Sequence, residues 1–323
     1  MPENKIIAVV GATGSQGGSL VEAILEHPES GLTVRALTRN PGSEKAKALA
    51  SRGIEVVRGD ADDPASLEAA FTGAYGAYLV TNFNEHSDSA RETAQAKAMA
   101  DAVKKVGVQH VIWSTLEDTR ELIADDDPRF VKFEGGRYLP HSDSKGEADG
   151  YFRELGVPAT FMRTCFFWEN LLGPLFVRRG DDGALLLTIA MGDGLLPGVS
   201  VKNIGRFAFG IFTHPEFTGR TVGVANAHLT GAEMADTLAR VTGQDVRYEP
   251  YTLDELRAFD MPMAGHFANM MQFQQAFNAE YVGARDLDVV RSLSPKTETF
   301  EQWVSEHRDQ LKAQPGWASP SSG

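Results

Sequence analysis

Residues 6–18 read Ile6-Ile7-Ala8-Val9-Val10-Gly11-Ala12-Thr13-Gly14-Ser15-Gln16-Gly17-Gly18, and this stretch decides the fold of the chain. Its apolar first half predicts a strand, its glycines predict a tight turn, and the amphipathic residues 19–27 predict a helix. This order directs main-chain N–H groups and a helix N-terminus toward an anionic pyrophosphate. Gly11 permits the turn dihedrals, Gly14 lets a phosphate approach the backbone, and Gly17 lets the helix pack near its strand. The spacing G-x-x-G-x-x-G therefore predicts a dinucleotide site, with a ligand-free βα turn as the alternative.

The next predicted strand, residues 32–38, indicates which dinucleotide is bound. Folds that bind NAD usually carry Asp or Glu at this strand end, where the carboxylate accepts from the ribose 2′-hydroxyl. Here the strand ends in Thr38 and Arg39, and no acidic residue follows before Glu44. A guanidinium pairs well with a 2′-phosphate. Arg39 therefore predicts NADP(H), with a solvated turn arginine as the alternative.

Composition narrows the class of protein. The chain has 323 residues, with 31 Lys and Arg against 44 Asp and Glu and a formal charge of −13, so it repels polyanions and we expect no direct nucleic-acid binding. A single cysteine, Cys165, excludes an intramolecular disulfide, fits a reducing compartment and is interpreted as a buried structural thiol. The scattered histidines predict no metal site. Without a long apolar run or room for a signal peptide, the sequence predicts no membrane span and a cytoplasmic location.

Strand and helix signals alternate through the first half, which predicts an α/β fold of Rossmann type with a doubly wound parallel sheet. Further strands are expected at residues 55–58, 77–80, 110–114 and 159–165, and helices at 44–52, 64–71, 87–106 and 142–155. We expect a dinucleotide-binding domain over residues 1–165, to which some later segments return. A smaller α+β domain for substrate or partner is expected over 166–316, followed by a disordered tail, 317–323.

Three segments of the chain carry further structural predictions. Residues 117–140 are long for a loop and predict a mobile lid or binding loop. In the second half, Thr230 and Glu233 predict a capping box, and a helix is expected over 299–311. The Met- and Phe-rich residues 261–277 favour core or a domain seam over an adaptable partner surface.

Six short motifs in this order resemble the NmrA-like family of atypical short-chain dehydrogenase/reductase folds. They lie at residues 11–18, 38–41, 59–63, 80–83, 145–147 and 167–172, and the resemblance covers about residues 5–310. It looks closest to the redox-sensor branch, whose members bind NADP(H) and act through protein partners. The resemblance therefore implies an NADP(H)-binding regulator.

The resemblance also implies a cofactor role for residues in each motif. The pyrophosphate would be held at Gly11, Thr13, Gly14, Ser15, Gln16 and Gly17, and the 2′-phosphate at Thr38, Arg39 and Asn40. Adenine would meet Asp62 and Asp63, with a helix N-cap as the alternative for Asp62. The ribose and nicotinamide side would be formed by Thr81, Asn82, Phe83, Ser114, Lys145, Phe167, Trp168, Glu169 and Asn170. For Glu169 and Asn170, helix capping is the alternative.

One departure from the reductase pattern concerns proton transfer. A working short-chain dehydrogenase uses Tyr-x-x-x-Lys, but here His141 stands where the tyrosine would be, four residues before Lys145. Tyr138 lies outside the helix, so it cannot substitute without another geometry. His141 is a chemically credible acid, and equally a surface residue at a helix start.

The sequence is interpreted as that of a redox sensor or regulator, with a reductase as the alternative. In the first, Lys145 holds ribose hydroxyls and the protein is a redox sensor with a regulatory protein partner. In the second, it is an NADPH-dependent reductase of a small carbonyl, quinone or imine, and Lys145 or His141 moves the proton. Either a monomer or a homodimer is compatible with the sequence.

Overall fold

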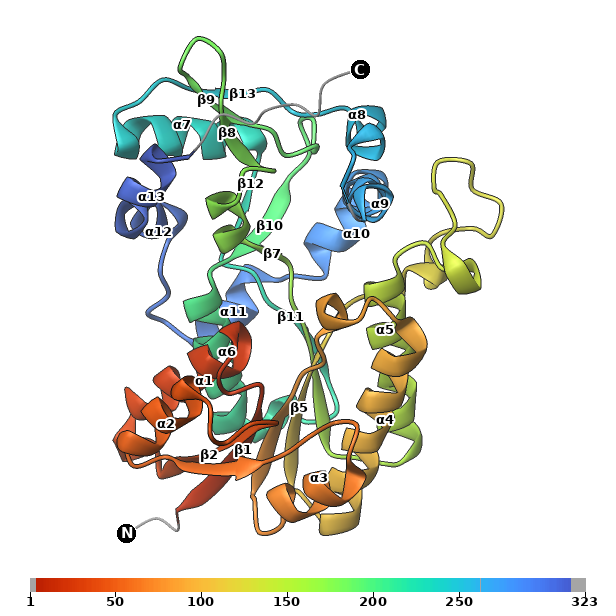
Figure 1. The fold of residues 1–323 in the computed structure, drawn as a ribbon, viewed down its shortest axis with the longest axis vertical. Coiled ribbons are helices and arrows are strands. Elements are labelled where there is room, and N and C mark those ends of the chain that lie inside the picture. The colour runs from red at the N-terminus through yellow and green to blue at the C-terminus, as the bar shows by residue number, and fades with distance from the viewer. Residues whose placement is uncertain (1–3, 262, 315–323) are drawn as a thin grey trace.

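The computed structural model describes residues 4–261 and 263–314, so the predicted tail at 317–323 lies outside the described residues. Its largest sheet has seven strands in the order β11-β6-β5-β4-β1-β2-β3 (Figure 1). All neighbouring strands in it are parallel. The strands are β1 (Lys5–Val10), β2 (Leu32–Thr38), β3 (Glu55–Arg58), β4 (Gly76–Leu79), β5 (His110–Thr115), β6 (Ala159–Arg163) and β11 (Thr221–Gly223). The predicted doubly wound parallel sheet is confirmed.

Helices cover both faces of this sheet because the buried strands send successive side chains to opposite sides. Ile7 and Val9 belong to one core and Ala8 to the other. The first face is covered by α1 (Ser15–Leu25), α2 (Glu44–Ser51) and α6 (Val201–Thr213). The second is covered by α3 (Pro64–Phe71), α4 (Ser89–Val106) and α5 (Pro140–Glu154).

Helix α1 begins at Ser15, earlier than the sequence predicts, and so includes Gly17 and Gly18. Glycine is a poor helix former, but here close packing requires it. A Cβ at Gly17 would lie 2.5 Å from the carbonyl oxygen of Gly11, so no other residue fits without a backbone shift. A second close approach, between Gly205 of α6 and the backbone of Ser19, presses α6 against α1.

The second half of the chain builds two small sheets and a helical layer at the carboxyl ends of the large sheet's strands (Figure 1). The sheets contain β7 (Phe166–Phe167), β10 (Leu196–Val199) and β12 (Ala227–Leu229), and β8 (Val177–Arg179), β9 (Leu185–Leu187) and β13 (Val246–Tyr248). The helices are α7 (Gly231–Thr242), α8 (Leu253–Ala258), α9 (Ala264–Ala276), α10 (Asn278–Gly283), α11 (Leu287–Leu293), α12 (Phe300–Glu306) and α13 (Arg308–Lys312). A third core, which includes Leu238 and Trp303, lies among these elements.

Several details of this half follow from local sequence. The predicted capping box is present, because the Thr230 hydroxyl accepts from the N–H of Glu233 and the Glu233 carboxylate accepts from the N–H of Thr230. The single helix predicted over 299–311 is divided at His307 into α12 and α13. Helix α6 and strand β11 return to the large sheet, so the two halves are interleaved.

Residues 117–140 project beside α5 at the right of Figure 1, in yellow. Three side chains of the segment are nevertheless buried, namely those of Ile123, Phe130 and Tyr138. Asn269 of α9 binds the segment at two points, since its side-chain amide contacts the backbone of Val131 and the carbonyl oxygen of Tyr138. This connection joins the segment to the helical layer.

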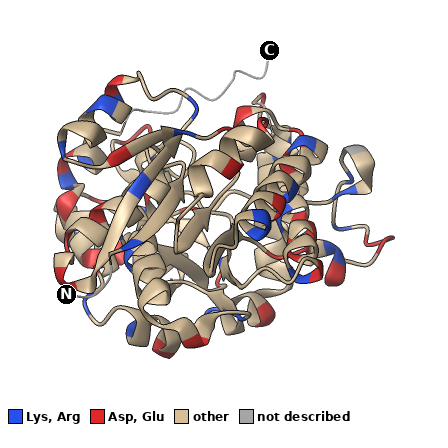
Figure 2. Cartoon of the chain, turned by 90° about the horizontal axis from the view of Figure 1, so that it is seen from below, with Lys and Arg blue, Asp and Glu red and all other residues tan. Residues whose placement is uncertain are grey.

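Charged residues of both signs are interspersed over the helices seen in Figure 2. Within residues 4–261 and 263–314, no helix combines the length and the apolar character needed to cross a membrane.

Candidate functional site

A cleft with a volume of about 1100 Å³ follows the carboxyl ends of the large sheet's strands and continues under α9. In parallel α/β sheets, ligands bind at this edge. Most of the residues predicted to bind the cofactor line the cleft: Gly11, Thr13, Gly14, Ser15, Gln16, Gly17, Thr38, Arg39, Thr81, Asn82, Phe83, Ser114, Lys145, Phe167, Glu169 and Asn170. His141 lines it too. The structure thus brings together segments that are far apart in the sequence.

The turn between β1 and α1 offers an anion site. Gly11 has φ of +67°, and its carbonyl oxygen accepts from the N–H of Gly14 at 2.8 Å. Gly14 is the N-cap of α1 and has no side chain to accept from the first-turn amides. These amides and the helix dipole complement a phosphate. The turn fits the pyrophosphate of a dinucleotide.

Gln16 has a structural task in addition to any contact with a ligand. Its Oε1 accepts from the hydroxyl of Tyr78 at 2.7 Å and from that of Ser114 at 2.8 Å. The side chain therefore joins α1 to β4 and β5. The hydroxyl proton of Ser114 is also used in this contact.

At the other end of the cleft, Arg39 follows β2. Its guanidinium makes a bidentate ion pair with Glu85 at 2.7 and 2.9 Å. Glu85 ends the short turn Phe83–Glu85 after β4 and also accepts from the side-chain amide of Asn82 at 3.1 Å. A 2′-phosphate on Arg39 would compete with this carboxylate.

Three predicted adenosine contacts do not line the cleft. The Asn40 side chain accepts from the N–H of Gly42 and shapes the turn after β2. Asp63, not Asp62, is the N-cap of α3, and Arg58 also binds its carboxylate. Asp62 accepts from two side chains of α4, namely Arg91 at 2.6 Å and Gln95 at 3.0 Å. In their place, Asp60 and Ala61 line the cleft.

Not all of the predicted nicotinamide contacts line the cleft either. Trp168 is buried in the third core against Phe300 and Trp303, so it does not reach the cleft. Glu169 accepts from the N–H of Val201 at 3.0 Å, which agrees with the helix-capping alternative for this residue, although it also lines the cleft.

Lys145 belongs to a buried polar network that sequence reasoning missed. Its Nζ lies 2.6 Å from the Thr81 hydroxyl, 3.1 Å from the Thr81 carbonyl oxygen and 3.2 Å from Glu92 Oε1. Glu92 of α4 has no exposed surface, and its carboxylate also accepts from the hydroxyls of Thr81 and Ser144. Two of the ammonium N–H groups thus have acceptors on Thr81, and the Glu92 carboxylate lies within ion-pair distance of the same nitrogen.

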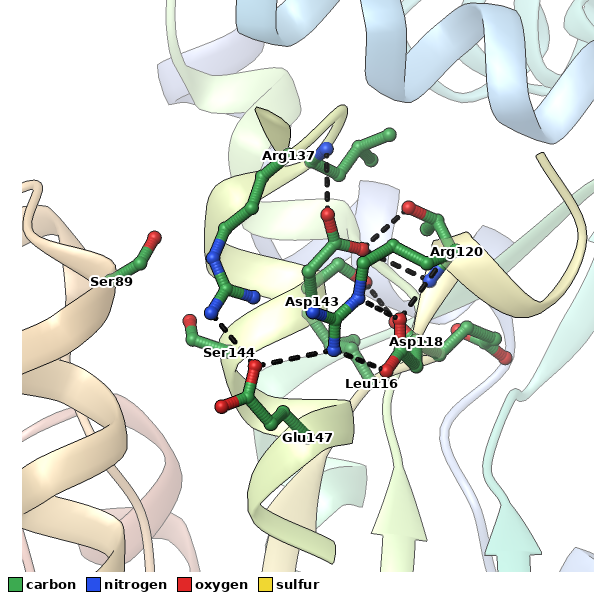
Figure 3. Close-up of polar contacts among 12 residues, drawn as sticks. Ser89, Leu116, Asp118, Arg120, Arg137, Asp143, Ser144 and Glu147 are labelled. Carbon is green, nitrogen blue, oxygen red and sulfur yellow. Dashed lines mark hydrogen bonds and ion pairs between the residues drawn. The ribbon is translucent and has the colours of Figure 1, made fainter. Parts of the chain in front are cut away.

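The start of α5, which carries His141 and Lys145, is fixed by a polar cluster (Figure 3). Buried Asp143 accepts from the N–H of Thr119 at 3.0 Å and from that of Leu139 at 3.2 Å. Around it lie the ion pairs of Arg120 with Asp118 and of Arg120 and Arg137 with Glu147. These contacts position α5 against the segment 117–140.

His141 is half-buried in the cleft and is not a surface residue at a helix start. Its ring lies 4.5 Å from that of His266 on α9, and Phe83 stacks on His266 with the ring centres 6.3 Å apart. Burial, followed by the neighbouring His266 and Lys145, holds the pKa of His141 well below 6.5. Burial also lowers the pKa of His266 to about 4. Both imidazoles are therefore uncharged at neutral pH.

Two other groups considered from the sequence have clear roles. Cys165 is buried, and burial raises the pKa of its thiol to about 12, which agrees with a structural thiol. The Tyr138 hydroxyl lies against the carbonyl oxygens of Ala124 and Asp125, inside the projecting segment. It is turned to that segment and cannot act in the cleft.

Beyond Lys145 the cleft becomes an apolar chamber. Its walls are formed by Phe83, Leu139, His141, Leu175, Phe176, Met261, Met263, His266, Phe267, Met270, Phe273, Gln274 and Tyr281. Sequence reasoning assigned the Met- and Phe-rich residues to core or a seam, and the structure gives the stretch both tasks, since Met271 is buried while Met263 and Met270 line the chamber. Gln274 Oε1 and the Nδ1 atoms of His141 and His266 are buried without a hydrogen-bond partner in the described part of the chain.

Comparison with known proteins agrees with this architecture. The NmrA-like family profile matches residues 3–304. FrzB of Cladobotryum sp, an NmrA-like family domain-containing oxidoreductase, is 30% identical over 301 residues, covering 85% of each chain. The corresponding malD of Malbranchea aurantiaca is 32% identical over 264 residues, covering 76% of this chain and 75% of its own.

Solved structures show the same fold. NmrA, a negative transcriptional regulator, has a TM-score of 0.75 at 21% identity, covering 94% of this chain and 95% of its own. Triphenylmethane reductase of Citrobacter sp., complexed with NADP(H), has a TM-score of 0.72 at 22% identity, covering 94% of this chain and 99% of its own. With a family profile that spans most of its length, this chain belongs to the NmrA-like family.

Proposed function

We propose that this protein binds NADP(H) in the cleft and reduces a small organic substrate held in the apolar chamber. The chamber is the observation that carries the proposal. A protein that only sensed its cofactor would need the anion site and Arg39, but not a continuation of the cleft lined by apolar side chains of α9. The related FrzB and malD are described as oxidoreductases, which supports the same choice.

In this proposal, residues of the chain bind the cofactor and orient it toward the substrate. The α1 N-terminus and the glycine turn hold the pyrophosphate, and Arg39 holds the 2′-phosphate. The polar network of Lys145, Thr81 and Glu92 lies between the part of the cleft that would hold the cofactor and the apolar chamber. The apolar side chains of the chamber exclude water from the reacting carbon. The nicotinamide, when bound, supplies the hydride.

The direct test combines binding and turnover. Purified protein is titrated with NADPH, and oxidation of NADPH is then followed with a panel of carbonyl, quinone and imine compounds, with products identified by mass spectrometry. We expect NADPH to bind and at least one compound to be reduced. Binding without any turnover would instead favour the redox-sensor alternative, in which the cofactor acts through a protein partner.

Arg39→Ala is expected to weaken NADPH binding by about 1.5–3 kcal/mol more than NADH binding, because only NADPH brings a phosphate to the guanidinium. Isothermal titration of both dinucleotides, with wild type and variant, measures the difference. Equal losses for NADPH and NADH would show that Arg39 does not contact the 2′-phosphate. Arg58→Ala is the matched control, since Arg58 binds Asp63 and does not line the cleft.

Glu85→Gln is expected to change the binding affinities for NADPH and NADH in opposite directions. The substitution frees Arg39 from its carboxylate partner and removes a charge that repels the phosphate, so NADPH should bind roughly 3- to 10-fold more tightly. NADH should bind more weakly, because a carboxylate at this end of the cleft accepts from a ribose hydroxyl better than an amide does. The same titrations measure both effects, and parallel shifts would contradict the competition.

A further inference from the structure

Lys145 is held in a defined orientation where it lines the cleft. Its Nζ donates to the Thr81 hydroxyl at 2.6 Å and to the Thr81 carbonyl oxygen at 3.1 Å. The Trp113 ring packs against it, with Nζ 5.3 Å from the ring centre, and Trp113 Nε1 donates to buried Asp149 at 3.0 Å. Only these two hydrogen bonds of the Lys145 ammonium occur within the described residues, so its third N–H remains for a ligand in the cleft.

Glu92 of α4 determines the direction of these hydrogen bonds. Its side chain has no exposed surface, and its Oε1 accepts from the Thr81 hydroxyl at 2.7 Å. A hydroxyl has a single proton, so the Thr81 oxygen presents a lone pair to Lys145. The same Oε1 lies 3.2 Å from the lysine Nζ and balances its charge. Glu92 thus acts on both the charge and the orientation of the ammonium, although Glu92 does not line the cleft.

We propose that Glu92 is a positioning residue, which directs the third N–H of Lys145 to the ribose hydroxyls on the nicotinamide side of the dinucleotide. The inference rests on the proposed function, because that function places NADP(H) in the cleft. An apolar side chain would serve the packing of α4 equally well, since a buried ion pair contributes little to stability after the cost of desolvation. The charge at Glu92 is therefore assigned to the cleft and not to the fold.

The test compares NADPH with 2′,5′-ADP, a fragment that lacks the nicotinamide ribose. Glu92→Gln is expected to weaken NADPH binding at least about 10-fold, because the ribose loses a charge-assisted contact, and to leave the binding of 2′,5′-ADP unchanged. Lys145→Met should act in the same way. The double variant should lose no more NADPH affinity than Lys145→Met alone, because Glu92 acts through Lys145.

Glu298→Gln is the matched control. It removes another buried carboxylate that lies beside a lysine, since Glu298 is 3.9 Å from Lys202, and neither residue lines the cleft. This variant should bind NADPH as the wild type does.

The pH profile of NADPH binding separates positioning from a purely structural role. Between about pH 7 and pH 9, Glu92→Gln should lose affinity as the pH rises, because a buried amine without a counter-ion gives up its proton more readily. The wild type and Lys145→Met should bind evenly over this range. Burial holds the pKa of His141 well below 6.5 and that of His266 near 4, and it raises the pKa of Asp149 to about 6, so these neighbours change charge below the range.

Thr81→Val supplies the same comparison should Glu92→Gln fail to fold by circular dichroism. It removes the hydroxyl that lies between Glu92 and Lys145, so NADPH should bind more weakly and 2′,5′-ADP should not. Equal affinity of wild type and Glu92→Gln for NADPH, or equal losses for NADPH and 2′,5′-ADP, overturns the inference and leaves the proposed function standing. Wild-type protein that binds no NADPH overturns the proposed function itself.

Discussion

Arg285→Met is expected to lower the free energy of unfolding by about 3–5 kcal/mol, because it leaves a buried carboxylate without its cation. Arg285 has no exposed surface and binds Glu117 through two nitrogens. The same guanidinium also donates to the carbonyl oxygens of Thr164 at 2.6 Å and Tyr281 at 2.9 Å. It thereby joins the region after α10 to the ends of β5 and β6. Chemical denaturation measures the loss.

Two comparisons keep this prediction specific. Arg291→Met removes an exposed ion pair with Asp288 and should change stability little. The double variant Arg285→Met/Glu117→Leu should recover part of the loss, since apolar replacement of a complete buried pair is often tolerated. A loss below about 1 kcal/mol for Arg285→Met would mean that Glu117 finds water or another partner.

Gly14→Val is expected to weaken NADPH binding at least about 100-fold, equivalent to roughly 3 kcal/mol, in a protein that remains folded. Gly14 is exposed at the cleft and caps α1, so a valine side chain would cover the amides that are proposed to bind the pyrophosphate. The local backbone tolerates a side chain better than at Gly17, because a Cβ would lie 3.3 Å from the Gly11 carbonyl oxygen. Titration with NADPH, with circular dichroism as the measure of folding, checks both parts.

Gly150→Ala is the matched control for Gly14→Val. Gly150 lies within α5, and a Cβ there would meet no atom within 4 Å. The control should bind NADPH as the wild type does. Unchanged NADPH affinity in folded Gly14→Val would refute the assignment of this turn to the pyrophosphate.

The sequence predicted the large sheet well because its signals are local. The strand at residues 32–38 and the helix beginning at Pro64 have the expected bounds, since apolar runs and a proline at the first helical position each act within a few residues. Helix α1 was predicted to begin too late, because its glycines resemble a turn. The close approach that requires Gly17 comes from Gly11 and Val10 and cannot be derived from propensity.

The site was harder to predict because it depends on which way side chains point. Trp168 stands beside Phe167 in a motif, yet it faces the third core while Phe167 lines the cleft. Glu92 lies in a helix whose polar residues suggest a solvated face, and nothing local indicates that it is fully buried under Lys145. His266 and Gln274 join the chamber through tertiary packing of α9. Such contacts between distant segments have no counterpart in spacing or periodicity.

The position of α9 has a consequence for how this protein can change. The helix supplies a wall of the chamber, yet it follows every strand of the large sheet in the chain, and Asn269 holds it through backbone contacts. The half-buried Phe267 and Met270 of α9, and Met263 just before the helix, can therefore be varied while the glycine turn and the contacts of Asn269 stay intact. Mutagenesis libraries confined to these three positions should diversify the compounds accepted without a new cofactor cradle. If the protein is the proposed reductase, the residues that would contact the substrate can thus be exchanged while those that would bind the cofactor stay unchanged.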